Sequence, residues 1–174
     1  MVLREGGEGA LTIDRLCRDL GRTKGAFYHH FADVHVYADA LLAAWEARAM
    51  QPAGHTPVKK SLVTRGGRRE AHGSVDPLLD RSIRAWGLRD PRAREFVSRV
   101  DEQRIAQLAA SYPPSVSLSA RRKLSKLEYA ASVGLKQLYP DLPHPAMREL
   151  EQSLRDALRR VAGATRRSGQ GRAI

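Results

Sequence analysis

Apolar residues recur every three or four positions along most of the chain, which is the period of an α-helix with one buried face. The first clear stripe runs over residues 13–20, where Ile13, Leu16, Cys17 and Leu20 share one side. No stretch shows the strict polar and apolar alternation of a half-buried β-strand. We therefore predict an all-α protein.

Residues 11–31 predict two short helices joined by a tight turn. Thr12 and Thr23 are residue types that commonly cap helix N-termini. Gly21, between them, readily adopts the left-handed conformation that ends a helix. Asp33 is placed to cap a third helix. The buried side of that helix is expected to carry Tyr37, Leu41, Leu42 and Trp45. Helix, glycine-containing turn and helix is the layout of the helix-turn-helix motif.

Residues 51–74 interrupt the helical pattern with two prolines and four glycines. This composition predicts a linker between an N-terminal domain, residues 1–50, and a helical C-terminal domain, residues 75–162. Residues 163–174 are basic and rich in glycine, which predicts a frayed tail. The helices expected in the C-terminal domain are Val75–Leu88, Pro91–Tyr112, Ser119–Leu138 and Pro145–Ala162.

The last two of these helices each carry a narrow apolar stripe, as in coiled coils. Two antiparallel helices with such stripes bury each other only in part, and a second copy would complete a four-helix bundle. We interpret the stripes as a homodimer interface, the alternative being that both are satisfied within the monomer. The stripe residues are Leu124, Leu127, Ala131, Leu135, Leu138, Met147, Leu150, Leu154 and Val161.

A ligand pocket would lie between helices of the C-terminal domain. The ligand's chemistry is not identified by any cluster of charged or polar residues. Aromatic residues at helical spacing also simply fill a core, which is the alternative interpretation. The candidate lining residues are Ile83, Trp86, Phe96, Val100 and Tyr129.

The chain of 174 residues has 30 basic and 19 acidic side chains, a formal net charge of +11. Such a charge favours attraction to polyanions at long range. The surplus is uneven, because residues 1–50 hold six basic and seven acidic side chains, whereas residues 113–174 hold twelve and five. Net charge alone therefore does not locate a nucleic-acid surface.

Several classes of protein are excluded. Cys17 is the only cysteine, so neither an intrachain disulfide nor a cysteine-based zinc site can form. The apolar stretches are far shorter than the ~20 residues of a membrane span. No phosphate loop, nucleophile elbow or zinc-protease motif is present. We expect a cytoplasmic protein that is not an enzyme and uses no cofactor or metal.

The second helix of a helix-turn-helix enters the major groove of DNA. Lys24 is placed to contact a base or a phosphate, and Gly25 and Ala26 keep the helix thin. The candidate phosphate donors are the side chains of Tyr28, His29 and His30 and the backbone amides at the helix starts Thr12 and Thr23.

The segment LTIDRLCRDLGRTKGAFYHHF, residues 11–31, resembles the DNA-binding domain of the tetracycline-repressor (TetR-type) family of transcriptional regulators. The positions that match the family pattern are Thr12, Leu16, Gly21, Thr23, Phe27, Tyr28, His30 and Phe31. The resemblance implies a three-helix domain, a homodimer on an operator of double-stranded DNA with two half-sites, and repression relieved by a small molecule. It implies phosphate contacts at Thr12, Tyr28 and His30, and a base-facing role for Lys24, Gly25 and Ala26.

One departure from the family concerns the first helix. Only about ten residues, three of them glycine, precede Leu11, where family members have a full helix. We expect either a start further upstream or a truncated first helix. A missing helix would leave Leu16, Leu20 and Phe27 exposed.

Two further departures concern charge. Arg22 replaces the usual apolar residue after the turn glycine and must extend into solvent or to a phosphate. Val34 replaces a lysine common at the next helix start, so one phosphate contact is lost unless His35 supplies it. These departures leave an alternative function, that of a dimeric helical ligand-binding or scaffold protein that has lost DNA binding.

Overall fold

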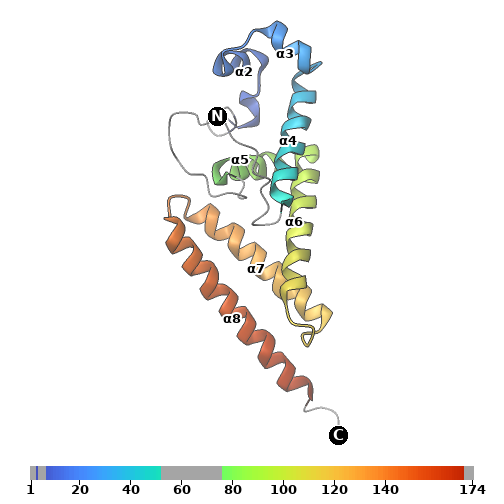
Figure 1. Cartoon of the computed structure of the whole chain (residues 1–174), viewed down its shortest axis with the longest axis vertical. Coiled ribbons are helices and arrows are strands. Elements are labelled where there is room, and N and C mark those ends of the chain that lie inside the picture. The colour runs from blue at the N-terminus through green and yellow to red at the C-terminus, as the bar shows by residue number, and fades with distance from the viewer. Residues whose placement is uncertain (1–2, 4–6, 52–75, 171–174) are drawn as a thin grey trace, which may run out of the picture. The chain divides into compact units, whose positions relative to one another are not determined.

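The computed structural model describes residue 3, residues 7–51 and residues 76–170, with side chains described as far as residue 162. Every regular element in these ranges is helical, which confirms the predicted all-α class (Figure 1). The elements are the 3-10 helix η1 (Glu8–Ala10) and the α-helices α2 (Ile13–Leu20), α3 (Lys24–His30), α4 (Val34–Met50), α5 (Pro77–Gly87), α6 (Pro91–Ser111), α7 (Leu118–Leu138) and α8 (His144–Gln170).

Local capping determines where α2, α3 and α4 begin. The hydroxyl of Thr12 accepts a hydrogen bond from a backbone N–H of α2 at 3.3 Å, and that of Thr23 accepts one from α3 at 3.1 Å. The Asp33 carboxylate accepts two backbone N–H groups of α4, at 2.7 and 2.9 Å. Gly21 ends α2 with φ 61° and ψ 35°, in the left-handed region. All four predicted termini are confirmed.

The chain forms two compact units, residues 1–100 and residues 101–174. The division falls within α6. The predicted linker, apart from Gln51, lies outside the described residues, so the domain boundary placed there stays a prediction. In the first unit α4 and α6 are linked by Arg99, whose guanidinium contacts both carboxylate oxygens of Glu46 at 2.5 and 2.8 Å. That contact lowers the pKa of Glu46.

The core of the first unit draws residues from every helix between α2 and α6. Its buried members are Leu3, Leu11, Leu16, Cys17, Phe27, Leu42, Trp45, Ala49, Ile83, Trp86, Ala93 and Val100. Tyr37 and Leu41, predicted on the buried side of α4, pack against this cluster as partly buried residues. Helices α5 and α6 therefore share one core with α2, α3 and α4.

The short N-terminal segment covers part of this core. Leu3 and Leu11 are 5% and 9% exposed, and both pack in the cluster that holds Leu16 and Phe27. Leu16 and Phe27, which a missing first helix would have left exposed, are therefore covered, because these leucines contribute apolar contacts that the sequence pattern did not reveal. Leu20, a member of the apolar stripe of residues 13–20, is 65% exposed.

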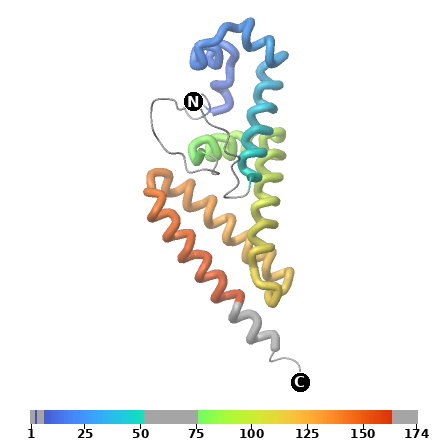
Figure 2. The backbone as a smooth tube through the Cα atoms, viewed as in Figure 1, coloured from blue at the N-terminus to red at the C-terminus, as the bar shows by residue number. Residues whose placement is uncertain are grey.

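The second unit is built on the antiparallel helices α7 and α8, which follow one another across a short connection (Figure 2). Its buried apolar residues are Tyr112, Leu124 and Ala162, with Val116 and Leu158 packed against them. Ser132 of α7 donates a hydrogen bond to Glu151 of α8 at 2.8 Å.

Four predicted helix bounds in the second unit differ from the structure. Helix α6 ends at Ser111 rather than Tyr112, and α8 begins at His144 rather than Pro145. Helix α7 begins one residue before Ser119, because the hydroxyl of Ser117 accepts the backbone N–H of Ala120 at 3.2 Å. Helix α8 continues to Gln170, past its predicted end at Ala162. The flexible tail stays a prediction. Alanine and arginine are strong helix formers, and several occur between residues 162 and 167. No helix among the described residues is long and apolar enough to cross a membrane.

The left-handed turn at Gly21 yields a stability prediction. Replacing Gly21 by Ala places a Cβ at φ 61° and should lower the free energy of unfolding by about 1–2 kcal/mol. Gly25 lies inside α3, where an added Cβ meets only the Thr23 hydroxyl at 3.8 Å. Gly25→Ala is the matched control and should raise stability by up to about 1 kcal/mol. Urea unfolding of both variants measures the difference, and equal effects would contradict the assigned turn.

Candidate functional site

An aromatic anchor holds one side of α3 against the first unit. The Phe27 ring is 9% exposed and lies 5.5 Å from the Phe31 ring and 5.9 Å from the Tyr37 ring, centroid to centroid. Residues on the other side of the same helix stay in solvent, and Tyr28 is 55% exposed. The burial of Phe27 thus determines which side of α3 faces outward.

The residues predicted to contact DNA occupy this outward surface and the start of α2. We define the α3 surface as Arg22, Thr23, Lys24, Gly25, Tyr28, His29 and His30, all of which are exposed. Thr12 is exposed at the start of α2, and Ala26 is half-buried. The hydroxyl oxygens of Thr12 and Thr23 each accept the backbone hydrogen bond that caps a helix.

An acidic residue that sequence reasoning missed lies beside Lys24. The Lys24 ammonium is 2.6 Å from a carboxylate oxygen of Asp14, and both side chains are more than half exposed. The hydrogen bond to Asp14, followed by the charge of that carboxylate, raises the pKa of Lys24. Acidic residues are common in the first turn of a helix, as Asp14 is in α2. Only the packing of α2 on α3 brings the pair together.

The start of α4 also presents polar groups. Asp33 accepts backbone hydrogen bonds from Val36 and His35, and these, the bond from Val36 first, lower the pKa of its carboxyl. His35 is exposed, as a phosphate contact would require, whereas Val34 is half-buried and packs against the core.

The residues predicted to line an effector pocket fall in both units, and four of them lie in one core. Ile83, Trp86 and Val100 are buried in the core of the first unit, with Phe96 packed against them. Tyr129 belongs to the second unit, where its hydroxyl donates to Asp101 at 2.7 Å. These four residues of the first unit thus fill a hydrophobic core, which was the alternative interpretation of the sequence pattern.

The predicted interface stripes are only partly covered within the second unit. Leu124 is buried, and Ala131, Leu135, Met147 and Leu154 are half-buried. Four stripe residues remain largely in solvent, at 59% exposure for Leu127, 74% for Leu138, 42% for Leu150 and 55% for Val161. The second unit therefore buries some of the stripe residues and leaves others exposed to solvent.

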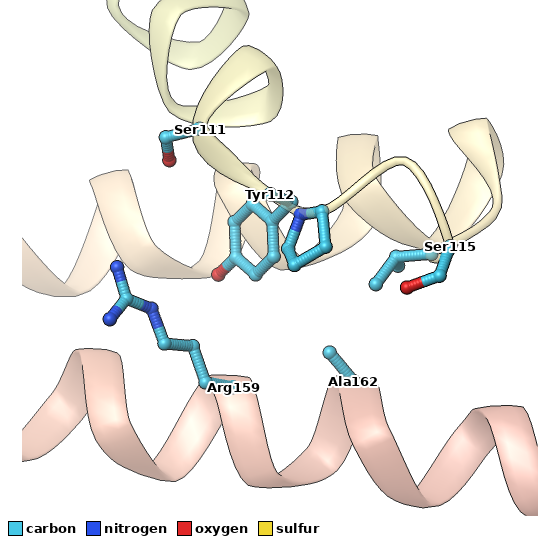
Figure 3. Close-up of a pocket in the computed structure, with 7 residues that line it drawn as sticks. Ser111, Tyr112, Ser115, Arg159 and Ala162 are labelled. Atoms are coloured by element: carbon cyan, nitrogen blue, oxygen red, sulfur yellow. The ribbon is translucent and has the colours of Figure 1, made fainter.

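A pocket of about 340 Å³ lies at the end of the second unit where α6 leads into α7. It is lined by Ser111, Tyr112, Pro113, Ser115, Val116, Arg159 and Ala162. In the close-up, Arg159 and Ala162 rise from α8 on the side opposite Tyr112 and Ser115 (Figure 3). Sequence reasoning missed this site because four of its seven lining residues, Tyr112, Pro113, Ser115 and Val116, lie in a loop, which carries no periodic signal.

Tyr112, which lines this pocket, is hydrogen-bonded to a buried carboxylate. The Tyr112 hydroxyl donates to Glu128 at 2.9 Å, and Glu128 is 6% exposed. Burial, and then the hydrogen bond to Glu128 and the charge of that carboxylate, raise the pKa of Tyr112 to about 12, while the positive charge of Arg159 acts in the opposite direction.

No family profile, curated protein or solved structure matches the chain in comparisons with known proteins. Within the described ranges, no group of three or more histidine, cysteine, aspartate or glutamate side chains is arranged to hold a metal ion. The function is therefore argued from the residues themselves.

The Tyr112–Glu128 hydrogen bond yields a prediction. Tyr112→Phe leaves the Glu128 carboxylate without its donor and should lower the free energy of unfolding by about 1–3 kcal/mol near neutral pH. Because the pKa of Tyr112 is raised in the folded state, this contribution is complete below the ordinary tyrosine pKa, about 10. It is lost as the pH rises through about 12.

Urea unfolding of wild type and Tyr112→Phe across this pH range measures the gap in stability. Tyr139→Phe is the control, since Tyr139 is 51% exposed, and it should change stability by less than about 0.5 kcal/mol. A Tyr112→Phe effect no larger than that of the control would contradict the assigned hydrogen bond.

Proposed function

We propose that the chain is a dimeric DNA-binding transcriptional regulator, a repressor that a small-molecule ligand releases from its operator. The observation that carries the proposal is the α3 surface, a set of exposed hydrogen-bond donors on a short helix whose opposite side is anchored by Phe27. The major groove, about 12 Å wide, admits such a helix. In this proposal α2 and α3 act as a helix-turn-helix, with α3 as the recognition helix.

The donors of the α3 surface suit the two kinds of contact that a recognition helix makes. Lys24, Gly25 and Ala26 form its first turn, which in this geometry lies nearest the base edges. Tyr28 and His30 follow one turn later and can donate to phosphates, which positions the helix without reading sequence. The resemblance of residues 11–31 to TetR-type regulators supports the same division of roles.

The Lys24–Asp14 ion pair sets a condition on this proposal. Lys24 must exchange the Asp14 carboxylate for a phosphate or a base, and Asp14 then repels the nearby DNA backbone. The exchange is feasible because both side chains are exposed, and ion pairs in solvent contribute little to stability. The net charge of +11 favours the approach of DNA.

Dimerisation is supported by the exposed stripe residues of α7 and α8. Leu127, Leu138, Leu150 and Val161 remain in solvent in a single copy. A second copy related by a twofold axis would cover them and form a four-helix bundle. A symmetric dimer presents two copies of α3, which suits an operator with two half-sites.

Selection from random duplex DNA tests the function directly. We expect recovery of a palindrome whose half-site centres lie about one helical turn, or a small multiple of it, apart. Recovery of no enriched sequence would count against DNA-directed regulation.

Charge substitutions at the α3 surface test the interface. On the selected duplex, Lys24→Gln should weaken binding by about 1–3 kcal/mol, and Asp14→Asn should strengthen it, because the substitution frees Lys24 and removes a negative charge. Fluorescence anisotropy titrations at fixed salt measure both. Lys126→Gln, an exposed α7 residue with the same change of charge, is the control. Equal weakening by the two lysine variants would show only a net-charge effect.

A charge placed on a stripe residue tests dimerisation. Leu127→Glu should shift the protein toward the monomer in sedimentation velocity, because a carboxylate would be buried in the interface. Leu88→Glu is the control, since Leu88 is 76% exposed and lies outside the stripes. A wild-type protein that sediments as a monomer at all concentrations would contradict the interface.

A second candidate function is a dimeric helical ligand-binding or scaffold protein without DNA binding. The ion pair between Asp14 and Lys24 favours it, because it neutralises the lysine at the start of α3. The two candidates differ in the duplex selection, where this second function predicts no enriched sequence.

A further inference from the structure

The walls of the pocket in the second unit are largely apolar. Pro113 and Val116 come from the connection between α6 and α7, and Ala162 comes from α8. The Tyr112 ring forms part of the same lining, opposite α8 (Figure 3). The volume of about 340 Å³ lies at the lower end of the range for small-molecule sites, about 300–1,000 Å³. Such a cavity suits a small ligand with an apolar body.

Two of the polar groups in the lining are already engaged. The Tyr112 hydroxyl donates to Glu128 at 2.9 Å, and the Ser111 hydroxyl donates to the Leu108 carbonyl at 2.7 Å. The Ser115 hydroxyl makes no hydrogen bond within the described part of the chain. Arg159 is exposed and forms no ion pair with any side chain in the described ranges. The pocket thus offers a ligand one guanidinium and one hydroxyl.

The surroundings of the pocket are positively charged. Residues 111–127 and 157–162 contain no acidic side chain, and Asp156, next to the second stretch, accepts a hydrogen bond from Gln152 at 3.0 Å. The same stretches contain Arg121, Arg122, Lys123, Lys126, Arg159 and Arg160. The carboxylate of Glu128 lies nearby, but it is buried and accepts the Tyr112 hydroxyl. A ligand with a negative charge is therefore attracted to this end of the unit, and a cation is repelled.

We propose that this pocket binds a small amphipathic monocarboxylate. Its carboxylate pairs with the Arg159 guanidinium, whose planar fork matches the two oxygens, and accepts a hydrogen bond from Ser115. Its short aryl or alkyl body lies against Val116, Ala162 and Tyr112. One guanidinium and one hydroxyl suit a single negative charge better than a phosphate dianion. The proposal does not depend on DNA binding, because every group it uses lies in residues 101–174.

Phenylbutyrate serves as the probe, titrated into the full-length protein without DNA. Proton–carbon NMR of the Val116 methyl groups reports occupancy at the pocket itself. We expect saturable shifts of these signals. Phenylbutyramide, which has the same body without the charge, should bind at least about tenfold more weakly, because hydrogen bonds to charged groups are the stronger ones.

Paired variants test the assigned contacts. Arg159→Gln should weaken phenylbutyrate binding by about tenfold or more, whereas Arg160→Gln, the next residue on α8 and outside the lining, should change it less than about twofold. Ser115→Trp, in the loop, should fill the cavity and abolish the Val116 shifts. Thermal unfolding of each variant checks that it is folded.

Three outcomes would overturn the proposal. They are the absence of saturable Val116 shifts at millimolar phenylbutyrate, equal effects of Arg159→Gln and Arg160→Gln, and equal affinity for the carboxylate and the amide. None of these outcomes affects the duplex selection. Failure of the pocket proposal can therefore be distinguished from failure of the proposed DNA binding.

Discussion

The burial of Phe27 is the interaction on which the first unit's outward surface depends. Its ring packs with Phe31 and Tyr37 inside the core. A helix of seven residues, such as α3, is far too short to be stable alone, because helix nucleation is costly. Tertiary burial of one side must therefore hold it in place. The same burial leaves Tyr28, His29 and His30 exposed to solvent.

The helix termini were predictable because their causes are local. Thr12, Thr23 and Asp33 each bond a backbone amide within three residues, and Gly21 adopts its backbone conformation without steric penalty. Such interactions are visible in a few consecutive letters of sequence. The stripe of apolar residues likewise predicted the burial of Leu16 and Cys17.

The remaining features depend on contacts between distant or aperiodic residues. Leu3 is buried through packing that no short pattern encodes. The Lys24–Asp14 pair requires α2 and α3 to be packed, and the pocket is assembled from a loop and the later part of α8. The surface of α3 could thus be predicted from sequence as a set of exposed residues, but its charge balance could not.

The burial of Cys17 makes the chain's single thiol a natural reporter. Its side chain is 8% exposed within the core of the first unit. An alkylating reagent can reach it only when that core opens, so the labelling rate measures the free energy of opening. Because the chain has no other cysteine, the signal comes from one position and requires no engineered label. Anything that binds the closed first unit more tightly than the open one must slow the labelling.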